Sequence, residues 1–304
     1  MGIEVSVIIV NYNTSELLDN CIDSVQLKTE DVNYEIIVVD NNSEKGSLDH
    51  LIKKYPTVNF IFSEENLGFG RANNLGVSYA NGKYLFFLNP DTLLLNNAIS
   101  ILYEFMEANP QTGACGGNLY KQDNTPAISF HTMDFYTREW RILLNKKWPS
   151  GFNITNKPQD VSVIMGADLF IRRDIFNRLK GFDPDFFLYF EEVYLCDLVR
   201  RDGYKVTSVP QARIIHLEGA AAENKSEELN KWSYQEHWYS KFVYFSKTKG
   251  KFKTALLYWA NMLKLGTAKA TYTLKHNPEK LYYWGKKQEV LKKTYSRYCQ
   301  YLKR

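Results

Sequence analysis

The sequence has few cysteines and no long apolar run, and each shortage excludes a class of protein. Its 304 residues contain only four cysteines, which are widely spaced and form no CxxC or Cys/His cluster. This spacing argues against a structural zinc site and for a reducing compartment. No stretch reaches the ~18 uninterrupted apolar residues of a membrane-spanning helix, and the N-terminus shows no secretory signal. With 44% hydrophobic residues, the chain has ample core for one large or two small domains.

Acidic residues are almost absent from the last part of the chain. Residues 241–304 carry 16 Lys and Arg against two acids, whereas residues 1–240 carry 22 Lys and Arg against 32 acids. The net charge of +4 therefore joins an acidic body to a basic tail, which also holds thirteen Phe, Tyr and Trp residues. So many aromatic side chains are not typical of a disordered arm. We expect helices in residues 226–304, packed on the body, lying on anionic lipid, or both.

The body alternates short apolar runs with amphipathic segments. Strands are expected at residues 5–10, 35–39, 58–62, 84–88, 161–165 and 204–209, and helices at 16–27, 68–80, 96–108 and from 190 onward. Residues 120–160 lose this rhythm and are expected to form an irregular insertion. The alternation predicts βαβ units and an α/β fold with a mainly parallel sheet.

Polar residues follow three of these strands. The first ends in Asn11-Tyr12-Asn13, the second in Asp40-Asn41-Asn42-Ser43, and the fourth in Asn89-Pro90-Asp91. Because parallel strands present their carboxyl ends at one edge of a sheet, these groups should line one crevice. Asp40 there suits a pyrimidine N–H or ribose hydroxyls, and Asp91 suits a divalent cation that takes other ligands from a phosphate. The alternative is that each group caps a following helix, with Thr14 or Ser15 and Ser43 as the capping residues.

The segment ENLGFGRANN opens a helix with two glycines. It matches the dinucleotide fingerprint poorly, because Asn73 replaces the third glycine and the segment follows the third strand instead of the first. Glycines at a helix N-terminus still expose backbone N–H groups to an anion, with Arg71 able to assist, and a diphosphate is the natural candidate.

Two further segments carry ionisable groups. Glu191 and Glu192 fall in the first turn of a helix, where they stabilise the helix dipole or, if partly buried, serve as a general base. His216 ends the apolar stretch RIIH and is either structural or an additional metal ligand beside Asp91.

Taken in order, these motifs resemble a known family. VSVIIVNYN, IIVVDNNS, ENLGFGRANN, FFLNPDT, the run from GADLFIRRD to GFDPDFFLYFEE, and RIIH are similar to those of family 2 inverting glycosyltransferases of the GT-A fold, with bacterial rhamnosyltransferase-like members closest in appearance. The resemblance covers about residues 3–220. It implies a catalytic domain at 1–225, with nucleotide-sugar binding in 1–118 and acceptor binding in 119–225, and a helical extension at 226–304.

The resemblance also assigns roles to residues. It implies that Asp91 binds the metal, with Asn89 in place of the family's first Asp, and that His216 joins the metal. Glu192 falls at the Asp of the family's catalytic Glu-Asp pair, one methylene longer, and Glu191 falls at its Glu. The donor cleft would be lined by residues at the strand ends and the glycine segment: Asn11, Asn13, Asp40, Asn42, Asn66, Gly68, Asn73 and Asn89.

The expected function is transfer of a sugar with inversion, from dTDP-rhamnose or a UDP-sugar and with Mg²⁺ or Mn²⁺, to a glycan or polyprenyl-linked saccharide of a bacterial surface polysaccharide. The expected location is the cytoplasm at the inner face of the cell membrane, with an anionic membrane surface as partner and no nucleic acid; the oligomeric state stays open. The alternatives are a catalytically silent binding module of the same fold and a nucleotidyltransferase.

Overall fold

The computed structural model describes residues 2–146, 151–217 and 227–303. The chain forms two compact units, which we call the sheet unit (Met1–Met133, Pro149–Phe187 and Glu191–Asn224) and the helical unit (Asp134–Trp148, Leu188–Phe190 and Lys225–Arg304). The domain boundary expected at residue 225 lies outside the described residues. Residues 134–148 and 188–190 belong to the helical unit, although the sequence placed them in the acceptor part at 119–225.

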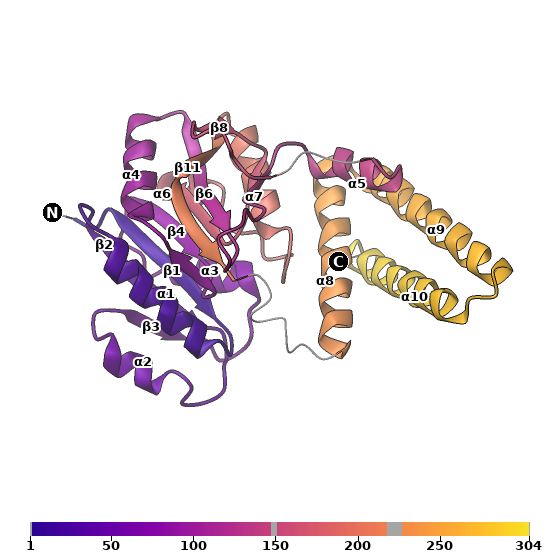
Figure 1. Cartoon of the computed structure of the whole chain (residues 1–304), viewed down its shortest axis with the longest axis horizontal. Coiled ribbons are helices and arrows are strands. Elements are labelled where there is room, and N and C mark those ends of the chain that lie inside the picture. The colour runs from indigo at the N-terminus through magenta and orange to yellow at the C-terminus, as the bar shows by residue number, and fades with distance from the viewer. Residues whose placement is uncertain (1, 147–150, 218–226, 304) are drawn as a thin grey trace. The chain divides into compact units, whose positions relative to one another are not determined.

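The sheet unit is built on one large mixed sheet (Figure 1). Its strands are β1 (Val5–Asn11), β2 (Tyr34–Asp40), β3 (Asn59–Phe62), β4 (Tyr84–Leu88), β5 (Thr92–Leu94), β6 (Thr112–Tyr120), β8 (Gln159–Asp160), β10 (Asp168–Arg172) and β11 (Lys205–His216). The order is β3-β2-β1-β4-β10-β6-β11-β5, with β8 beside β11. The first four strands are parallel, and β10 runs antiparallel to β4 and β6. Two short strands, β7 (Phe130–His131) and β9 (Val163–Ile164), pair separately.

Helices cover both faces of this sheet. They are α1 (Ser15–Lys28), α2 (Asp49–Lys54), α3 (Phe69–Val77), α4 (Ala98–Ala108), α6 (Arg173–Arg178) and α7 (Glu191–Arg201). On one face, α1 and α4 bury their apolar side chains against alternate residues of β1 and β4 such as Val7 and Phe86. On the other face, α3 packs so closely that a Cβ at Gly76 would lie 2.6 Å from Ile8. The fold class expected from the sequence, an α/β fold with a mainly parallel sheet, is confirmed.

The expected elements are found with changes in length, and the strands β5, β6 and β10 and the helices α2 and α6 were not expected. The strand expected at 161–165 is reduced to the two residues of β9, and the strand expected at 204–209 continues to His216 as β11. The insertion at 120–160 contains a helix, α5 (Phe135–Leu143), which begins where the Asp134 carboxylate accepts hydrogen bonds from the N–H groups of Tyr136 and Thr137. An aspartate at this position is a strong helix start.

The helical unit combines α5 with three long helices. These are α8 (Glu227–Lys249), α9 (Lys251–Leu274) and α10 (Pro278–Tyr301), and Figure 1 shows α9 and α10 as a hairpin. Aromatic side chains fill the space between the helices, as where the rings of Tyr258 and Tyr295 stack 3.8 Å apart. The unit also buries ions in pairs: the ammonium of Lys241 lies 2.9 Å from the carboxylate of Glu139, and each residue is only 5% exposed.

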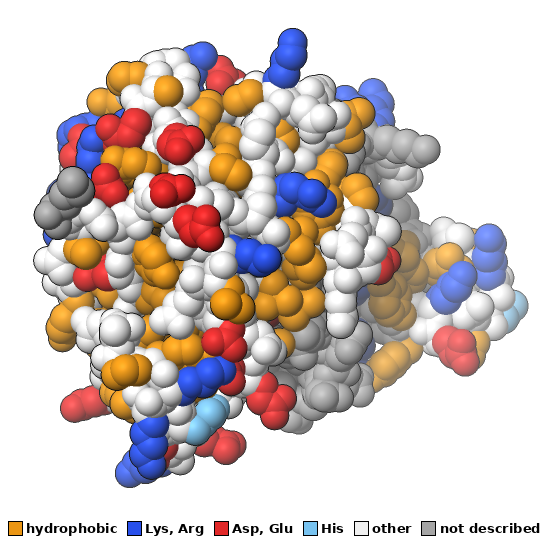
Figure 2. Space-filling model, turned by 60° about the vertical axis from the view of Figure 1, so that its left-hand side comes forward, with side chains coloured by type: hydrophobic (Ala, Val, Ile, Leu, Met, Phe, Trp, Pro, Cys, Tyr) orange, Lys and Arg blue, Asp and Glu red, His pale blue; other side chains and the backbone are white. Residues whose placement is uncertain are grey.

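Two further observations concern the lengths of the helices and the charges on the surface. Among the described residues, no helix combines the length and the apolar character needed to cross a bilayer. On the face of the sheet unit in Figure 2, acidic and basic side chains are interspersed with apolar ones. A strongly basic, acid-poor surface is therefore a property of the C-terminal helices and not of this face.

Candidate active site at the carboxyl ends of the strands

The polar strand ends do lie at one edge of the sheet. In the register of β1 and β2, Asn11 pairs with Asp40, and in that of β1 and β4, Ile9 pairs with Leu88. The segment Asn89-Pro90-Asp91 follows Leu88 directly, so it leaves the sheet at the same edge as Asn11 and Asp40. The pairing thus places these strand ends at one edge of the sheet, as the sequence predicted.

Asp40 is fixed by hydrogen bonds at the end of β2. The Asn11 amide donates to Asp40 Oδ1 (2.8 Å) and to the Ser43 hydroxyl (3.1 Å), and the Ser43 N–H donates to Asp40 Oδ2 (3.1 Å). Asp40 is 6% exposed and Asn11 is fully buried. A carboxylate has about four lone-pair sites, so Asp40 keeps capacity for a ligand donor. Asn11 orients Asp40 and, because it is fully buried, has no exposed atoms that could contact a ligand.

Asn13 and Asn42 shape the two loops beside Asp40. Both residues are exposed and have positive φ, +54° and +66°, a conformation that asparagine tolerates better than most residues. The Asn13 carboxamide accepts a hydrogen bond from the N–H of Glu44 (2.9 Å), and its own N–H donates to the Ser43 hydroxyl (2.8 Å). The two loops are therefore held to each other through Ser43 and Asn13.

The helix-cap alternative does not account for these side chains. Thr14 precedes α1 but makes no side-chain capping bond; its hydroxyl donates to Asn11. Ser43 lies five residues before Leu48, the residue that precedes α2. The turn at Asn89–Asp91 leads into the strand β5 and not into a helix.

The glycine segment forms a tight turn before α3. Gly68 has φ +77°, and a Cβ there would lie 2.2 Å from the carbonyl oxygen of Phe187. The Gly68 N–H donates to Asn66 Oδ1 (3.0 Å), and the Phe69 N–H donates to the Phe187 carbonyl (3.0 Å). These two donors are occupied within the protein, so they do not form the anion cradle that the sequence predicted. Only a residue without a side chain fits at Gly68.

Two other residues of this segment also turn inward. The Asn73 amide donates to the Phe69 carbonyl one turn earlier (3.0 Å) and is 1% exposed, so Asn73 shapes α3 and does not reach a ligand. The Arg71 Nε donates to the Leu67 carbonyl (2.8 Å), which ties that guanidinium to the turn.

A candidate cation site lies where the turn after β4 meets the end of β11. His216 Nε2 is 3.4 Å from Asp91 Oδ1, and the Leu217 N–H donates to the Asp91 carbonyl (2.9 Å), so the end of β11 is held against the turn after β4. Asn89 Oδ1 is buried and has no hydrogen-bond partner among the described residues. Such an oxygen is costly unless a ligand uses it.

These donors fit a divalent cation that keeps several of its ligands from solvent and substrate. Within residues 2–146, 151–217 and 227–303, no three His, Cys, Asp or Glu side chains cluster as a complete metal cage. One carboxylate, one imidazole and an amide oxygen are, however, what Mg²⁺ or Mn²⁺ accepts when diphosphate oxygens and water complete the shell. Asp91, His216 and Asn89 are therefore the residues that would hold it.

The two glutamates at the start of α7 face different surroundings. Glu191 is buried, and it packs beside Gly70 in α3, where an added Cβ would be 3.5 Å from the Glu191 Cβ. Burial, together with the charge of Glu192, raises the pKa of Glu191 well above its ordinary value. Glu192 is half-buried and lies over Gly166, with its Cγ 3.5 Å from an added Cβ there. Burial raises the pKa of Glu192 to about 7.

Gly166 connects Glu192 to the cation site. Ala167, the next residue, accepts a hydrogen bond at its carbonyl from the Asn89 N–H (3.0 Å). One peptide segment thus touches both the turn that carries Asp91 and the side chain of Glu192. Along the sheet edge, the groups therefore follow one another in the order Asp40, then Asp91 with His216, then Glu192.

Three residues outside the predicted donor-binding set also build this edge. Asn41, 3% exposed, donates to Asn66 Oδ1 (3.0 Å) and accepts from the Leu67 N–H (2.8 Å), which joins the loop after β2 to the glycine turn. Ser43 joins the loops after β1 and β2, and the Phe187 carbonyl closes the start of α3. The run DNNS signalled the first two, but no local pattern pointed to Phe187.

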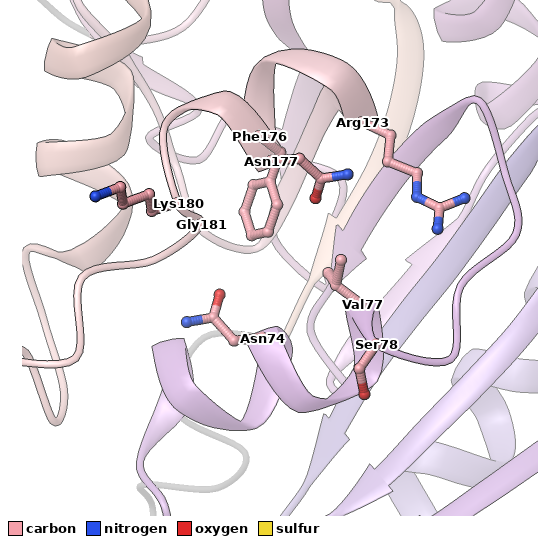
Figure 3. Close-up of a pocket in the computed structure, with 8 residues that line it drawn as sticks. All are labelled: Asn74, Val77, Ser78, Arg173, Phe176, Asn177, Lys180 and Gly181. Carbon is pink, nitrogen blue, oxygen red and sulfur yellow. The ribbon is translucent and has the colours of Figure 1, made fainter.

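A separate cavity of about 450 Å³ lies elsewhere on the sheet unit (Figure 3). Asn74, Val77 and Ser78 line it from the C-terminal end of α3, and Arg173 and Asn177 line it from α6. Asn66 and Gly68, two of the predicted donor residues, are at the opposite, N-terminal end of α3. This cavity is therefore not the site formed by the strand ends.

Known proteins share this arrangement of elements. The chain is 17% identical to the mannosyltransferase PcManGT from Pyrobaculum calidifontis in complex with GDP-Man and Mn²⁺, with a TM-score of 0.58, covering 97% of this chain and 87% of that one. A crystal structure of GalNAc-T7 with UDP, GalNAc and Mn²⁺ also gives a TM-score of 0.58 at 19% identity, covering 84% of this chain and 54% of that one. At these identities the likeness shows the fold, which is that of GT-A glycosyltransferases.

Sequence relatives agree with the fold. The chain is 26% identical over 230 residues to an N-acetylglucosaminyl-diphospho-decaprenol L-rhamnosyltransferase of Mycobacterium tuberculosis, covering 69% of this chain and 75% of the relative. It is 25% identical over 263 residues to the rhamnosyltransferase WbbL of Escherichia coli, covering 81% and 94%. Residues 6–180, more than half of the chain, match the model of glycosyl transferase family 2. The resemblance drawn from the motifs is thereby confirmed, and the protein is a glycosyltransferase that belongs to family 2.

Proposed function

We propose that this glycosyltransferase moves a sugar with inversion from a nucleotide-diphosphate donor to a glycan or lipid-linked saccharide acceptor. dTDP-rhamnose is the first candidate donor, and a UDP-sugar is the second. The observation that carries the proposal is the order of groups along the sheet edge: Asp40, then Asp91 with His216, then Glu192. This order matches the order of base, diphosphate and reacting sugar in such a donor.

In this proposal each residue has one task. Asp40, held by Asn11 and Ser43, accepts hydrogen bonds from the pyrimidine or the ribose. Asp91, His216 and Asn89 hold a divalent cation, which when bound neutralises the charge on the leaving diphosphate. None of these groups forms a covalent bond with the sugar.

Glu192 supplies the base. With a pKa near 7, about half of its carboxyl groups are ionised at neutral pH, which is close to ideal for proton abstraction. Glu192 removes the proton of the acceptor hydroxyl as the hydroxyl oxygen attacks the anomeric carbon. The bond from that carbon to the diphosphate oxygen breaks on the opposite face, and the nucleoside diphosphate leaves with the bonding electrons. Attack opposite the leaving group inverts the anomeric centre.

The rhamnosyltransferase relatives and the charge of the tail suggest where the reaction occurs. One relative is named for a decaprenyl-diphosphate-linked acceptor. We infer for this chain an acceptor of the same kind, a polyprenyl-linked saccharide of surface polysaccharide synthesis at the cytoplasmic face of the cell membrane. The basic C-terminal helices would then face anionic lipid.

A thermal-shift panel tests the donor site. UDP, dTDP and GDP and their common sugars are added with and without Mn²⁺, because a ligand that binds the folded state raises the melting temperature, and a tighter ligand raises it more. We expect dTDP or UDP to stabilise the protein, and Mn²⁺ to increase the effect. In Asp91→Asn the Mn²⁺ increment and sugar transfer should both vanish, while in the exposed control Asp31→Asn both should persist. Normal transfer by Asp91→Asn with Mn²⁺ present would show that the cation assignment is wrong, and binding of donor with no transfer or hydrolysis would favour a silent module.

A further inference from the structure

One face of α9 carries a line of exposed apolar side chains. Phe252, Leu256, Trp259, Leu263 and Leu274 are 81%, 46%, 64%, 70% and 81% exposed. At 3.6 residues per turn these five side chains fall within an arc of about 60° on the helix. We call them the α9 stripe. The opposite side of the helix is the packed side, where Thr254, Leu257 and Tyr258 are buried.

Exposed apolar side chains that are scattered over a surface do not align along one face of a helix in this way. Single exposed apolar residues are ordinary, but an aligned row of large ones marks an interaction surface. Two occupants fit a narrow apolar row on a helix: a second helix in a coiled coil, or the interface of a lipid bilayer.

The charges beside the stripe decide between these occupants. Three exposed lysines, Lys251, Lys253 and Lys269, lie roughly 90–110° to either side of its centre, and α9 contains no acidic residue. A fourth, Lys264, donates instead to the carbonyls of Ile142 and Leu143 within the helical unit. In a pairing of two copies through this stripe, lysine would face lysine across the seam with no carboxylate of α9 to compensate. A surface of anionic headgroups is complementary to the same lysines, whose long stems let the ammonium groups reach outward while the apolar row is buried.

The neighbouring helix α10 has a similar composition. In α10, Tyr282 and Tyr283 are 66% and 49% exposed, and lysines outnumber acids by five to two. Tyrosine and tryptophan are the side chains that favour the boundary between headgroups and acyl chains.

We propose that the α9 stripe inserts into the interfacial layer of an anionic bilayer, with Phe252, Trp259 and Leu263 as the buried anchors and the flanking lysines on the headgroups. The proposal rests on the proposed function only for its biological setting, a membrane-linked acceptor. The contact itself is a property of α9 and is measurable without donor or acceptor.

Co-sedimentation with vesicles tests the anchors. The full chain is mixed with phosphatidylglycerol/phosphatidylcholine vesicles and with phosphatidylcholine vesicles alone. We expect salt-sensitive binding to the anionic vesicles, and a loss of partitioning by about 100-fold or more in Trp259→Gln/Leu263→Gln, since two large side chains no longer enter the apolar layer. The matched control, Leu27→Gln/Ile154→Gln, changes two residues that are 75% and 84% exposed on the sheet unit and should bind as the parent does.

The same vesicle assay tests the contribution of the lysines. Lys253→Gln/Lys269→Gln should lower binding to anionic vesicles roughly 30-fold, at about one fivefold step per lysine, while Lys45→Gln/Lys157→Gln on the sheet unit should not. Equal binding by parent and stripe variant would overturn the proposal. So would concentration-dependent dimers in sedimentation velocity that the stripe variant abolishes while vesicle binding persists, because the stripe would then join two copies.

A separate activity readout keeps this result distinct from the proposed function. Metal-dependent hydrolysis of the nucleotide sugar in solution should be equal in the parent and in Trp259→Gln/Leu263→Gln. Hydrolysis without vesicle binding by the parent would reject the stripe and keep the enzyme, and vesicle binding without hydrolysis would do the reverse.

Discussion

The sheet unit and the helical unit bury carboxylates in opposite ways. In the helical unit, Glu139 lies 2.9 Å from the ammonium of Lys241, and Glu236 is paired with Arg297. In the sheet unit, Glu191 and Glu192 have each other as neighbours, and burial raises the pKa of both. A cation beside a buried carboxylate favours the charged form of that group, whereas burial beside a second carboxylate raises the pKa.

This difference separates structural from chemical carboxylates without reference to any motif. Lys241 shows the other side of the same balance, because burial lowers its pKa while the Glu139 charge opposes that change. The opposite charges of Glu139 and Lys241 thus compensate each other. The pair in the sheet unit is left unbalanced, and Glu191 Oε2 has no hydrogen-bond partner among the described residues. Buried carboxylates with a raised pKa and no compensating cation are the ones to test for catalysis.

The largest expected effect is on turnover. Glu192→Gln should reduce sugar transfer by about 10²–10⁴, the contribution of a general base, with donor affinity nearly unchanged. Glu191→Gln should be milder, because that side chain packs against α3. Steady-state kinetics with a titration of the nucleotide checks both.

The matched control lies in the other unit: Glu139→Gln should leave turnover near that of the parent. If Glu191→Gln were the more damaging change, Glu191 would be the base and the two roles would be exchanged.

The next effect is on stability and belongs to the helical unit. Lys241→Met should reduce the free energy of unfolding by about 3–5 kcal/mol, because buried Glu139 loses the ammonium 2.9 Å away and keeps only the guanidinium of Arg138 at 4.0 Å. The double variant Lys241→Met/Glu139→Leu should recover most of the loss, since both members of the buried pair are replaced by apolar side chains. Urea unfolding followed by far-UV circular dichroism measures both.

The measured loss in Lys241→Met also tests the contrast between the carboxylates of the two units. A loss below about 1 kcal/mol would mean that the Glu139–Lys241 pair behaves like a surface ion pair, and the distinction between the two units would fail.

A smaller effect is expected at the glycine turn. Gly68→Ala places a Cβ against the Phe187 carbonyl at φ +77°, so the turn before α3 must shift. We expect a loss of about 1–3 kcal/mol together with weaker nucleotide binding, because the turn is joined through Asn66 and Asn41 to the loop after Asp40. Thermal melting with and without UDP or dTDP measures both.

Gly203→Ala is the control for backbone strain alone. Gly203 has φ +89°, but an added Cβ there meets nothing within 4 Å. Its cost should be about 1 kcal/mol with no change in nucleotide binding. Equal effects at the two glycines would show that the contact with Phe187 contributes nothing.

How far the sequence predicts this molecule depends on the range of the interactions. The buried strands carry continuous apolar runs, so β1, β2 and β4 and the polar edge that follows them could be predicted. The roles of Asn11 and Asn73 could not, because only the hydrogen bonds show that both are buried and turned inward. The short β9 is likewise set by its pairing with β7, far along the chain, and not by its own apolar run.

The pairing of α3 with Phe187 illustrates the same limit. The two segments are more than a hundred residues apart, and the contact uses a backbone carbonyl that any residue possesses. Sequence patterns report side chains, so contacts made by the backbone leave no trace in them. The choice between Glu191 and Glu192 is similar: adjacent glutamates differ only in what they pack against.

The smallest and most graded effect is on pH dependence. Since Glu192 has a pKa of about 7 and must be ionised to accept a proton, transfer should rise about tenfold per pH unit below pH 7 and level off above it. Stability should change in the opposite direction. A carboxyl whose pKa is raised from 4.5 to about 7 keeps a proton on folding that the unfolded chain has lost. Its contribution is therefore full below pH 4.5 and disappears as the pH rises through 7.

Glu192→Gln separates this contribution from those of the other ionisable groups. The variant cannot lose a proton at this position, so its free energy of unfolding should fall less between pH 5 and pH 8 than that of the parent, and urea unfolding across this range measures the difference. Glu191 keeps a raised pKa and leaves a smaller fall of the same sign. An equal fall in parent and variant, or transfer by the parent that does not change from pH 5 to pH 7, would mean that Glu192 is ionised throughout this range. The distinction between the two units would then be lost at the one residue on which the proposed chemistry depends.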